Sequence, residues 1–144
     1  HVLMKYNLFQ YIRCENDILK LVNCIMENAK GEDTKGSEDF WTKAEALYYQ
    51  ALIAYIWYEA PEEEKNMTTL LEMLNASEVR EDDENFQNAV DMLFSVLEQK
   101  NPHHFALRQY KKYKLAAGVI TYKRLLMMFI GYNICQQIEK AILT

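Results

Sequence analysis

The residues between Ser37 and Pro61 constrain the fold of this chain more than any other segment. Ser37 is a good helix N-cap, acidic residues follow it at 38 and 39, and Pro61 marks the end of the segment. Between these limits, apolar residues recur at spacings of three and four, with further apolar residues beside them: Phe40, Trp41, Ala44, Leu47, Tyr48, Tyr49, Ala51, Leu52, Ile53, Tyr55, Ile56 and Trp57. This pattern predicts one long central helix that is contacted on several sides.

Five further segments show the same helical spacing. The first follows a cap at Asn16 or Asp17 and stops at Gly31, and the second follows Asn66 and ends near Asn75. The remaining three are predicted at about 85–99, 102–117 and 119–143, the middle one with Asn101 as its cap and Pro102 at its first position. Residues 31–36, 61–66 and 77–84 are expected to be connecting loops.

No alternating strand pattern and no internal repeat is present. The length of 144 residues suits one domain, and a chain that is 50% apolar with four Gly and two Pro is expected to fold. The sequence therefore predicts a single all-α domain over residues 1–144, a compact bundle of about six helices with short loops.

Charge is divided unevenly along the chain. Residues 1–100 hold nine Lys and Arg against 20 Asp and Glu, a net charge of −11, whereas residues 101–144 hold seven against one, a net charge of +6. Two interpretations are open. The basic part can form a contact face for a partner, or it can attract the acidic part when the domain folds.

The candidate contact residues lie in this basic part. They are Arg108, Lys111, Lys112, Lys114, Lys123 and Arg124. Tyr110 and Tyr113 interleave with them, a combination that suits nucleic acid because cations meet phosphates while rings stack on bases. In the alternative interpretation the helix is simply amphipathic, with both tyrosines buried and the lysines extended into water.

The sequence lacks the motifs that are typical of cofactor and metal binding. The four glycines, at 31, 36, 118 and 131, are too scattered to build a Walker A or G-x-G-x-x-G loop. The carboxylates at 81–84 lack the spacing of a calcium loop, which favours a solvated connector. We therefore expect no cofactor and no metal.

The histidines and cysteines do not predict catalysis either. His103 and His104 are adjacent, so on a helix they point about 100° apart, and in a first turn both are expected to be exposed. The cysteines at 14, 24 and 135 are odd in number and lack C-x-x-C spacing, which fits a reducing cytoplasm. An enzyme remains a distant alternative that would require a cleft bringing a histidine to a cysteine or a carboxylate.

Targeting and membrane signals are weak. The apolar run at 125–130 is shorter than the roughly 20 residues that a membrane span needs, and residues 1–11 contain no apolar signal-peptide core. We expect a cytoplasmic domain without direct membrane insertion. The histidine at position 1 suggests an excised piece of a longer protein.

Three segments together resemble a known family. They are FWTKAEALYYQALIAYIWYEAP (Phe40 to Pro61), TLLEMLNASEVREDD (Thr69 to Asp83) and FALRQYKKYKLAAG (Phe105 to Gly118). Their order and spacing resemble the all-α domain of TraG/TraD-like coupling proteins from type IV secretion and conjugative transfer systems of Gram-positive type. The resemblance covers about residues 6–118, and the apolar helix predicted at 119–143 departs from the family pattern.

The resemblance implies a function outside catalysis. The parent protein would be a membrane-anchored, hexameric ATPase that translocates DNA, and the helical domain would face the cytoplasm and recruit the relaxase, other relaxosome proteins and single-stranded DNA. The motor residues would lie outside this chain. The alternative is a free-standing protein–protein adaptor whose acidic segments, at 62–64 and 81–84, meet a basic partner without any DNA contact.

Overall fold

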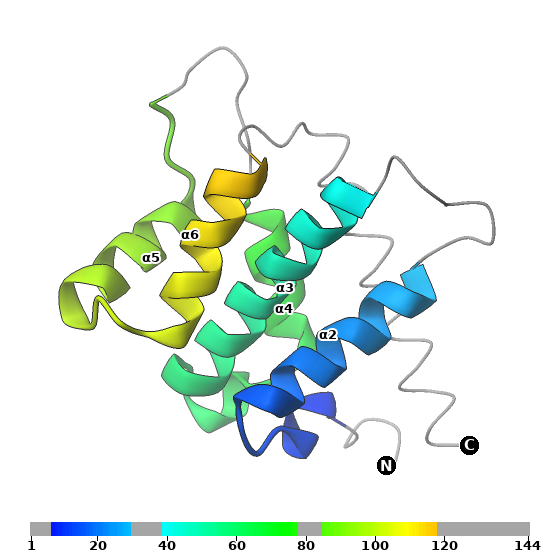
Figure 1. Ribbon diagram of the computed structural model, residues 1–144. Helices are drawn as coiled ribbons and strands as arrows, with labels where there is room; N and C mark the ends of the chain where they lie inside the picture. The colour runs from blue at the N-terminus through cyan, green and yellow to red at the C-terminus, as the bar shows by residue number, and fades with distance from the viewer. Residues whose placement is uncertain (1–6, 30–38, 78–84, 118–144) are drawn as a thin grey trace.

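The computed structural model describes residues 7–29, 39–77 and 85–117, and within these ranges the chain is all-α (Figure 1). Its elements are η1 (Leu8–Tyr11), α2 (Glu15–Ala29), α3 (Asp39–Glu59), η2 (Glu62–Glu64), α4 (Met67–Asn75), α5 (Ala89–Lys100) and α6 (Phe105–Ala117). The predicted all-α class is confirmed. The sixth helix predicted at 119–143, the loop at 31–36 and the acidic run at 81–84 lie outside the described residues.

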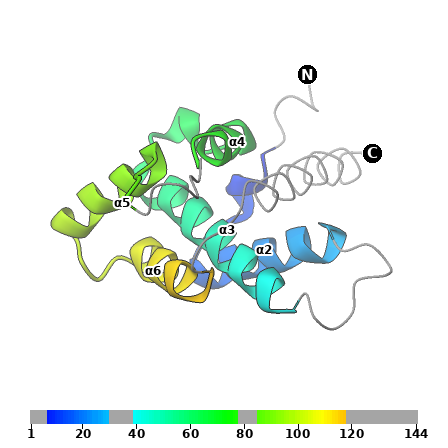
Figure 2. The same cartoon turned by 90° about the horizontal axis from the view of Figure 1, so that it is seen from above.

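Helix α3 is the centre of the bundle, as its wide apolar surface predicts. It packs against α2, α4 and α6, and the view from above shows these three helices arranged around it (Figure 2). Its buried residues point in several directions: Ala44, Tyr48, Tyr49, Ala51, Leu52, Ile53, Ala54 and Ile56. The side chains at 39–42, with the predicted core residues Phe40 and Trp41, lie outside the description.

Helix α2 buries one stripe against α3. Ile18, Val22 and Ile25 are fully buried, as the spacing predicts. The predicted cap at Asn16 or Asp17 is wrong, because the helix already begins at Glu15. The Asp17 carboxylate instead accepts a hydrogen bond from the backbone N–H of Arg13 at 3.0 Å, which fixes the entry to the helix.

The turn between α3 and α4 follows the prediction closely. Glu62–Glu64 form the exposed single turn η2, and Asn66 caps α4 by accepting a hydrogen bond from the Thr69 N–H at 3.0 Å. Helix α4 ends at Asn75, as predicted. Its apolar side, with Leu70 and Leu74, is buried.

Helix α5 begins later than the sequence predicts. The predicted start at Asn85 is wrong because Asn88 is the N-cap. Asn88 Oδ1 accepts from the Asp91 N–H at 2.8 Å and the Asn88 N–H donates to Asp91 Oδ2 at 3.1 Å, a reciprocal capping box. Among its apolar residues Val90, Phe94 and Leu97 are buried, whereas Leu93 is 39% exposed. Phe86, which the predicted range 85–99 includes, precedes the helix.

Helix α6 also begins later, at Phe105, and the predicted start at Pro102 with Asn101 as its cap is wrong. Asn101 instead ends α5, and its side chain accepts from the His103 N–H at 3.1 Å in the tight turn that contains Pro102. His104 then takes the capping position, because its Nδ1 accepts from the Ala106 N–H at 3.1 Å. The expected exposure holds for His103, but His104 is only 7% exposed.

Candidate nucleic-acid interface

Helix α6 has one buried side and one basic side, which follows from its 3.6-residue period. The buried residues are Ala106, Leu107, Gln109, Tyr110 and Tyr113. The predicted contact residues of this helix, Arg108, Lys111, Lys112 and Lys114, are all exposed. Lys123 and Arg124, the other two predicted contact residues, lie outside the described residues.

Two of the four cations are engaged by α5. Lys114 Nζ lies 2.9 Å from Asp91 Oδ1, and Lys111 forms an ion pair with Glu98. Both pairs line a groove of about 620 Å³ between the two helices, above the buried ring of Phe94. For these lysines, the interpretation that basic and acidic parts attract each other within the fold is correct.

Arg108 and Lys112 form the outward part of the basic side. They are four residues apart, so they lie on one face of α6, and neither makes an ion pair with another described residue. The Arg108 guanidinium carbon lies 5.8 Å from the centre of the Phe105 ring. These two cations are therefore the ones on α6 that remain open to a phosphate group.

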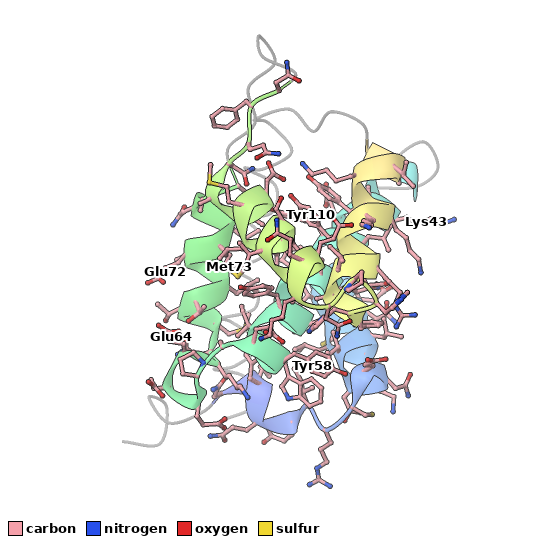
Figure 3. All side chains as sticks on the ribbon, turned by 90° about the vertical axis from the view of Figure 1, so that its left-hand side faces the viewer. Lys43, Tyr58, Glu64, Glu72, Met73 and Tyr110 are labelled. Carbon is pink, nitrogen blue, oxygen red and sulfur yellow. The ribbon has the colours of Figure 1, made fainter. Side chains whose placement is uncertain are left out.

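The two tyrosines of the basic segment are not available for stacking on bases. Tyr110 and Tyr113 are 7% and 5% exposed, and Tyr110 is seen between α5 and α6 in Figure 3. The Tyr110 ring stacks on Phe94 with centres 4.1 Å apart, and its hydroxyl donates to Asp91. Burial raises the pKa of Tyr113 well above its usual range. For these rings the amphipathic-helix interpretation is confirmed.

A smaller hollow lies where the end of α3 meets the beginnings of α2 and α6. We call it the Tyr58 hollow; it has a volume of about 340 Å³ and is lined by Glu15, Tyr58, Glu59, Asn101, His103, His104, Phe105 and Arg108. One of its aromatic residues, Tyr58, is 43% exposed and lies near the end of α3, in the lower part of the view in Figure 3. Sequence reasoning missed Tyr58, because a helix that is apolar on all sides gives no sign of which ring reaches the surface.

The polar side chains in the Tyr58 hollow hold one another in fixed positions. Glu59 accepts from Lys100 Nζ at 2.9 Å and lies 3.1 Å from His104 Nε2. The pKa of Glu59 is lowered, and the hydrogen bond from Lys100 is the largest cause. Burial acts in the opposite direction, and the hydrogen bond from His104 lowers the pKa further. Tyr58 donates to Glu15 Oε2 at 2.7 Å, and burial together with this bond raises the pKa of Tyr58 to about 12.

The contact between His104 and Glu59 is the histidine–carboxylate pair that an enzyme would require. Because His104 Nδ1 accepts from a backbone N–H, the ring proton must sit on Nε2, where it donates to Glu59. Both ring nitrogens are thus occupied, and no lone pair is left to act as a base. The raised pKa of Tyr58 likewise keeps its hydroxyl protonated near neutral pH. This geometry favours a structural role for His104.

The sequence of the chain matches a known protein family. The family described as type IV secretory system conjugative DNA transfer matches residues 1–136. The match covers more than half of this all-α chain, and the chain therefore belongs to this family. Neither the curated proteins nor the solved structures contain a match to it. Among the described helices, none has the length and apolar content to cross a membrane.

Proposed function

We propose that this chain is the recognition domain of a TraG/TraD-like coupling protein, and that it recruits DNA and relaxosome proteins such as the relaxase without catalysing a step itself. In this proposal the domain lies in the cytoplasm, and the DNA-translocating ATPase and the membrane anchor belong to the remainder of the parent protein. Membership in a conjugative DNA transfer family supports the general role.

The observation that carries the DNA part of the proposal is the outward pair on α6. Arg108 and Lys112 are exposed, share one face and have no carboxylate partner among the described residues. Cations in this state can neutralise phosphates and release their counterions without first breaking an ion pair. Lys111 and Lys114 would have to break their pairs with α5, so we assign them a smaller part.

The experiment is a binding titration with labelled single-stranded DNA at low salt. We expect Arg108→Gln/Lys112→Gln to weaken binding strongly, because each substitution removes a phosphate contact. The charge-matched control is Lys20→Gln/Lys43→Gln, which removes two exposed cations from α2 and α3. Equal binding by the two double variants would contradict the proposed surface.

The adaptor without DNA contact is supported by a different observation. Glu62, Glu63 and Glu64 are all exposed in η2. Glu62 forms an ion pair with Lys65 at 3.4 Å, and Glu63 and Glu64 form none with another described residue. If the wild-type chain binds no DNA at low salt but binds a basic relaxosome protein, and Glu63→Gln/Glu64→Gln weakens that complex, the adaptor replaces our proposal.

A further inference from the structure

We propose that the Tyr58 hollow holds one unpaired base of a DNA strand, stacked on the Tyr58 ring, while Arg108 binds the adjoining phosphate. This inference rests on the proposed function, because it assumes that the α6 face meets DNA. It adds that the domain recognises single strands through a specific subsite and prefers them to duplex DNA.

The Tyr58 ring has the properties of a stacking platform. It is 43% exposed, whereas Tyr110 and Tyr113 of α6 are buried. Its hydroxyl is held by Glu15 at 2.7 Å, and its ring forms T-shaped pairs with the rings of Trp57 and His104, with centres 4.7 and 5.0 Å away. A ring fixed in this way loses little conformational freedom when a base stacks on it.

Arg108 supplies the cation in the same hollow. Its guanidinium lies over the Phe105 ring at 5.8 Å and makes no ion pair with a described carboxylate. A planar guanidinium can donate two parallel hydrogen bonds to a phosphate, which a lysine cannot do. Lys112 follows one helical turn later, about 6 Å along the axis, where the same strand can continue.

The two carboxylates that line the hollow are already engaged. Glu59 accepts from Lys100 and His104, and Glu15 accepts the Tyr58 hydroxyl. The negative charge of Glu59 is thereby offset within the protein, and the carboxylate of Glu15 fixes the ring. The volume of about 340 Å³ lies at the small end of the range of about 300–1,000 Å³ for ligand pockets, which suits one base.

A base inside a duplex is covered on both faces by its neighbours, so it cannot stack on Tyr58 without leaving the helix. Stacking is also tolerant of sequence because every base has a π-face. We therefore expect binding that requires bases, prefers single strands and shows little sequence preference.

The test compares the wild-type chain on two labelled strands of equal length, oligo-dT and an abasic strand that has the same phosphates without bases. We expect oligo-dT to bind at least about fivefold more tightly, because stacking contributes that much per base at its lower limit. Equal affinities would overturn the inference, and this comparison needs no variant.

Two variants then test whether the preference for oligo-dT depends on the Tyr58 ring. Tyr58→Leu should abolish the preference for oligo-dT and leave the abasic strand unaffected, whereas Tyr58→Phe should retain the preference because the ring remains. Circular dichroism checks that both variants are folded.

A preference that persists in Tyr58→Leu overturns the inference. If Arg108→Gln/Lys112→Gln still weakens binding to both strands in that case, the proposed function stands; if the wild type binds neither strand, both proposals fail.

Discussion

Single side chains join the helices of this domain at their ends, and Glu59 shows how. As the last residue of α3, it accepts from Lys100 at the end of α5 and from His104 at the start of α6. The same histidine caps α6 through its other ring nitrogen. One carboxylate thus connects three helices, and its charge state should influence stability.

The pKa of Glu59 is lowered from its ordinary value of 4.5, so its contribution to stability is present above that pH and is lost as the pH falls through the lowered pKa. We expect Glu59→Gln to be less stable than the wild type at neutral pH. The difference in the free energy of unfolding should shrink below about pH 4.5. Urea unfolding between pH 3 and 7 measures this, and a difference that stays constant down to pH 3 would contradict it.

Sequence reasoning was weakest at this residue scale. It predicts an exposed His104, because two adjacent histidines in a first turn usually face water. Helix α6 begins only at Phe105, however, so His104 is its N-terminal cap. It also gave no role to Tyr58, whose exposure depends on where α2 and α6 begin beside it. Both errors concern tertiary contacts that helical spacing does not encode.

At the scale of elements, Asp91 connects α5 to α6. Its Oδ2 accepts from the Asn88 N–H in the capping box, and its Oδ1 accepts from Lys114 at 2.9 Å and from the Tyr110 hydroxyl. Phe94 stacks on Tyr110 one turn further along α5. The position of the basic helix therefore depends on a carboxylate that belongs to its neighbour.

We expect Asp91→Ala to destabilise the domain by about 2–4 kcal/mol, because it removes half of a capping box and leaves the buried Tyr110 hydroxyl without its acceptor. Glu98→Ala is the matched control: its side chain is 47% exposed, and its pair with Lys111 contributes less than about 1 kcal/mol. Chemical denaturation compares the two, and equal losses would show that Asp91 is only another surface charge.

The boundaries of a helix could be predicted where the sequence contains only one candidate for the capping residue. Asn66 follows a proline-led turn and was correctly placed as the cap of α4. Before α5, however, two asparagines stand three residues apart, and Asn88 is the cap because Asp91 reciprocates its hydrogen bond. This N-x-x-D spacing was present in the sequence and could have decided the choice.

For the whole molecule, the uneven charge of the chain has two consequences at once. Lys111 and Lys114 meet carboxylates of α5 and stabilise the fold, while Arg108 and Lys112 face outward. Periodicity placed all four cations on the exposed side of α6, but it could not separate the two sets, because the partners come from another helix. Arg108 and Lys112 therefore form a narrow basic face, and the proposed contact with DNA depends on it.

The salt dependence of single-stranded DNA binding tests that account most directly. A plot of log affinity against log salt concentration has a slope of about −0.7 for each phosphate that a protein neutralises on a single strand. We predict that Arg108→Gln/Lys112→Gln reduces the magnitude of the wild-type slope by about 1.4, while Lys20→Gln/Lys43→Gln leaves it nearly unchanged. Identical slopes for the wild type and Arg108→Gln/Lys112→Gln would contradict the claim that this face of α6 meets DNA.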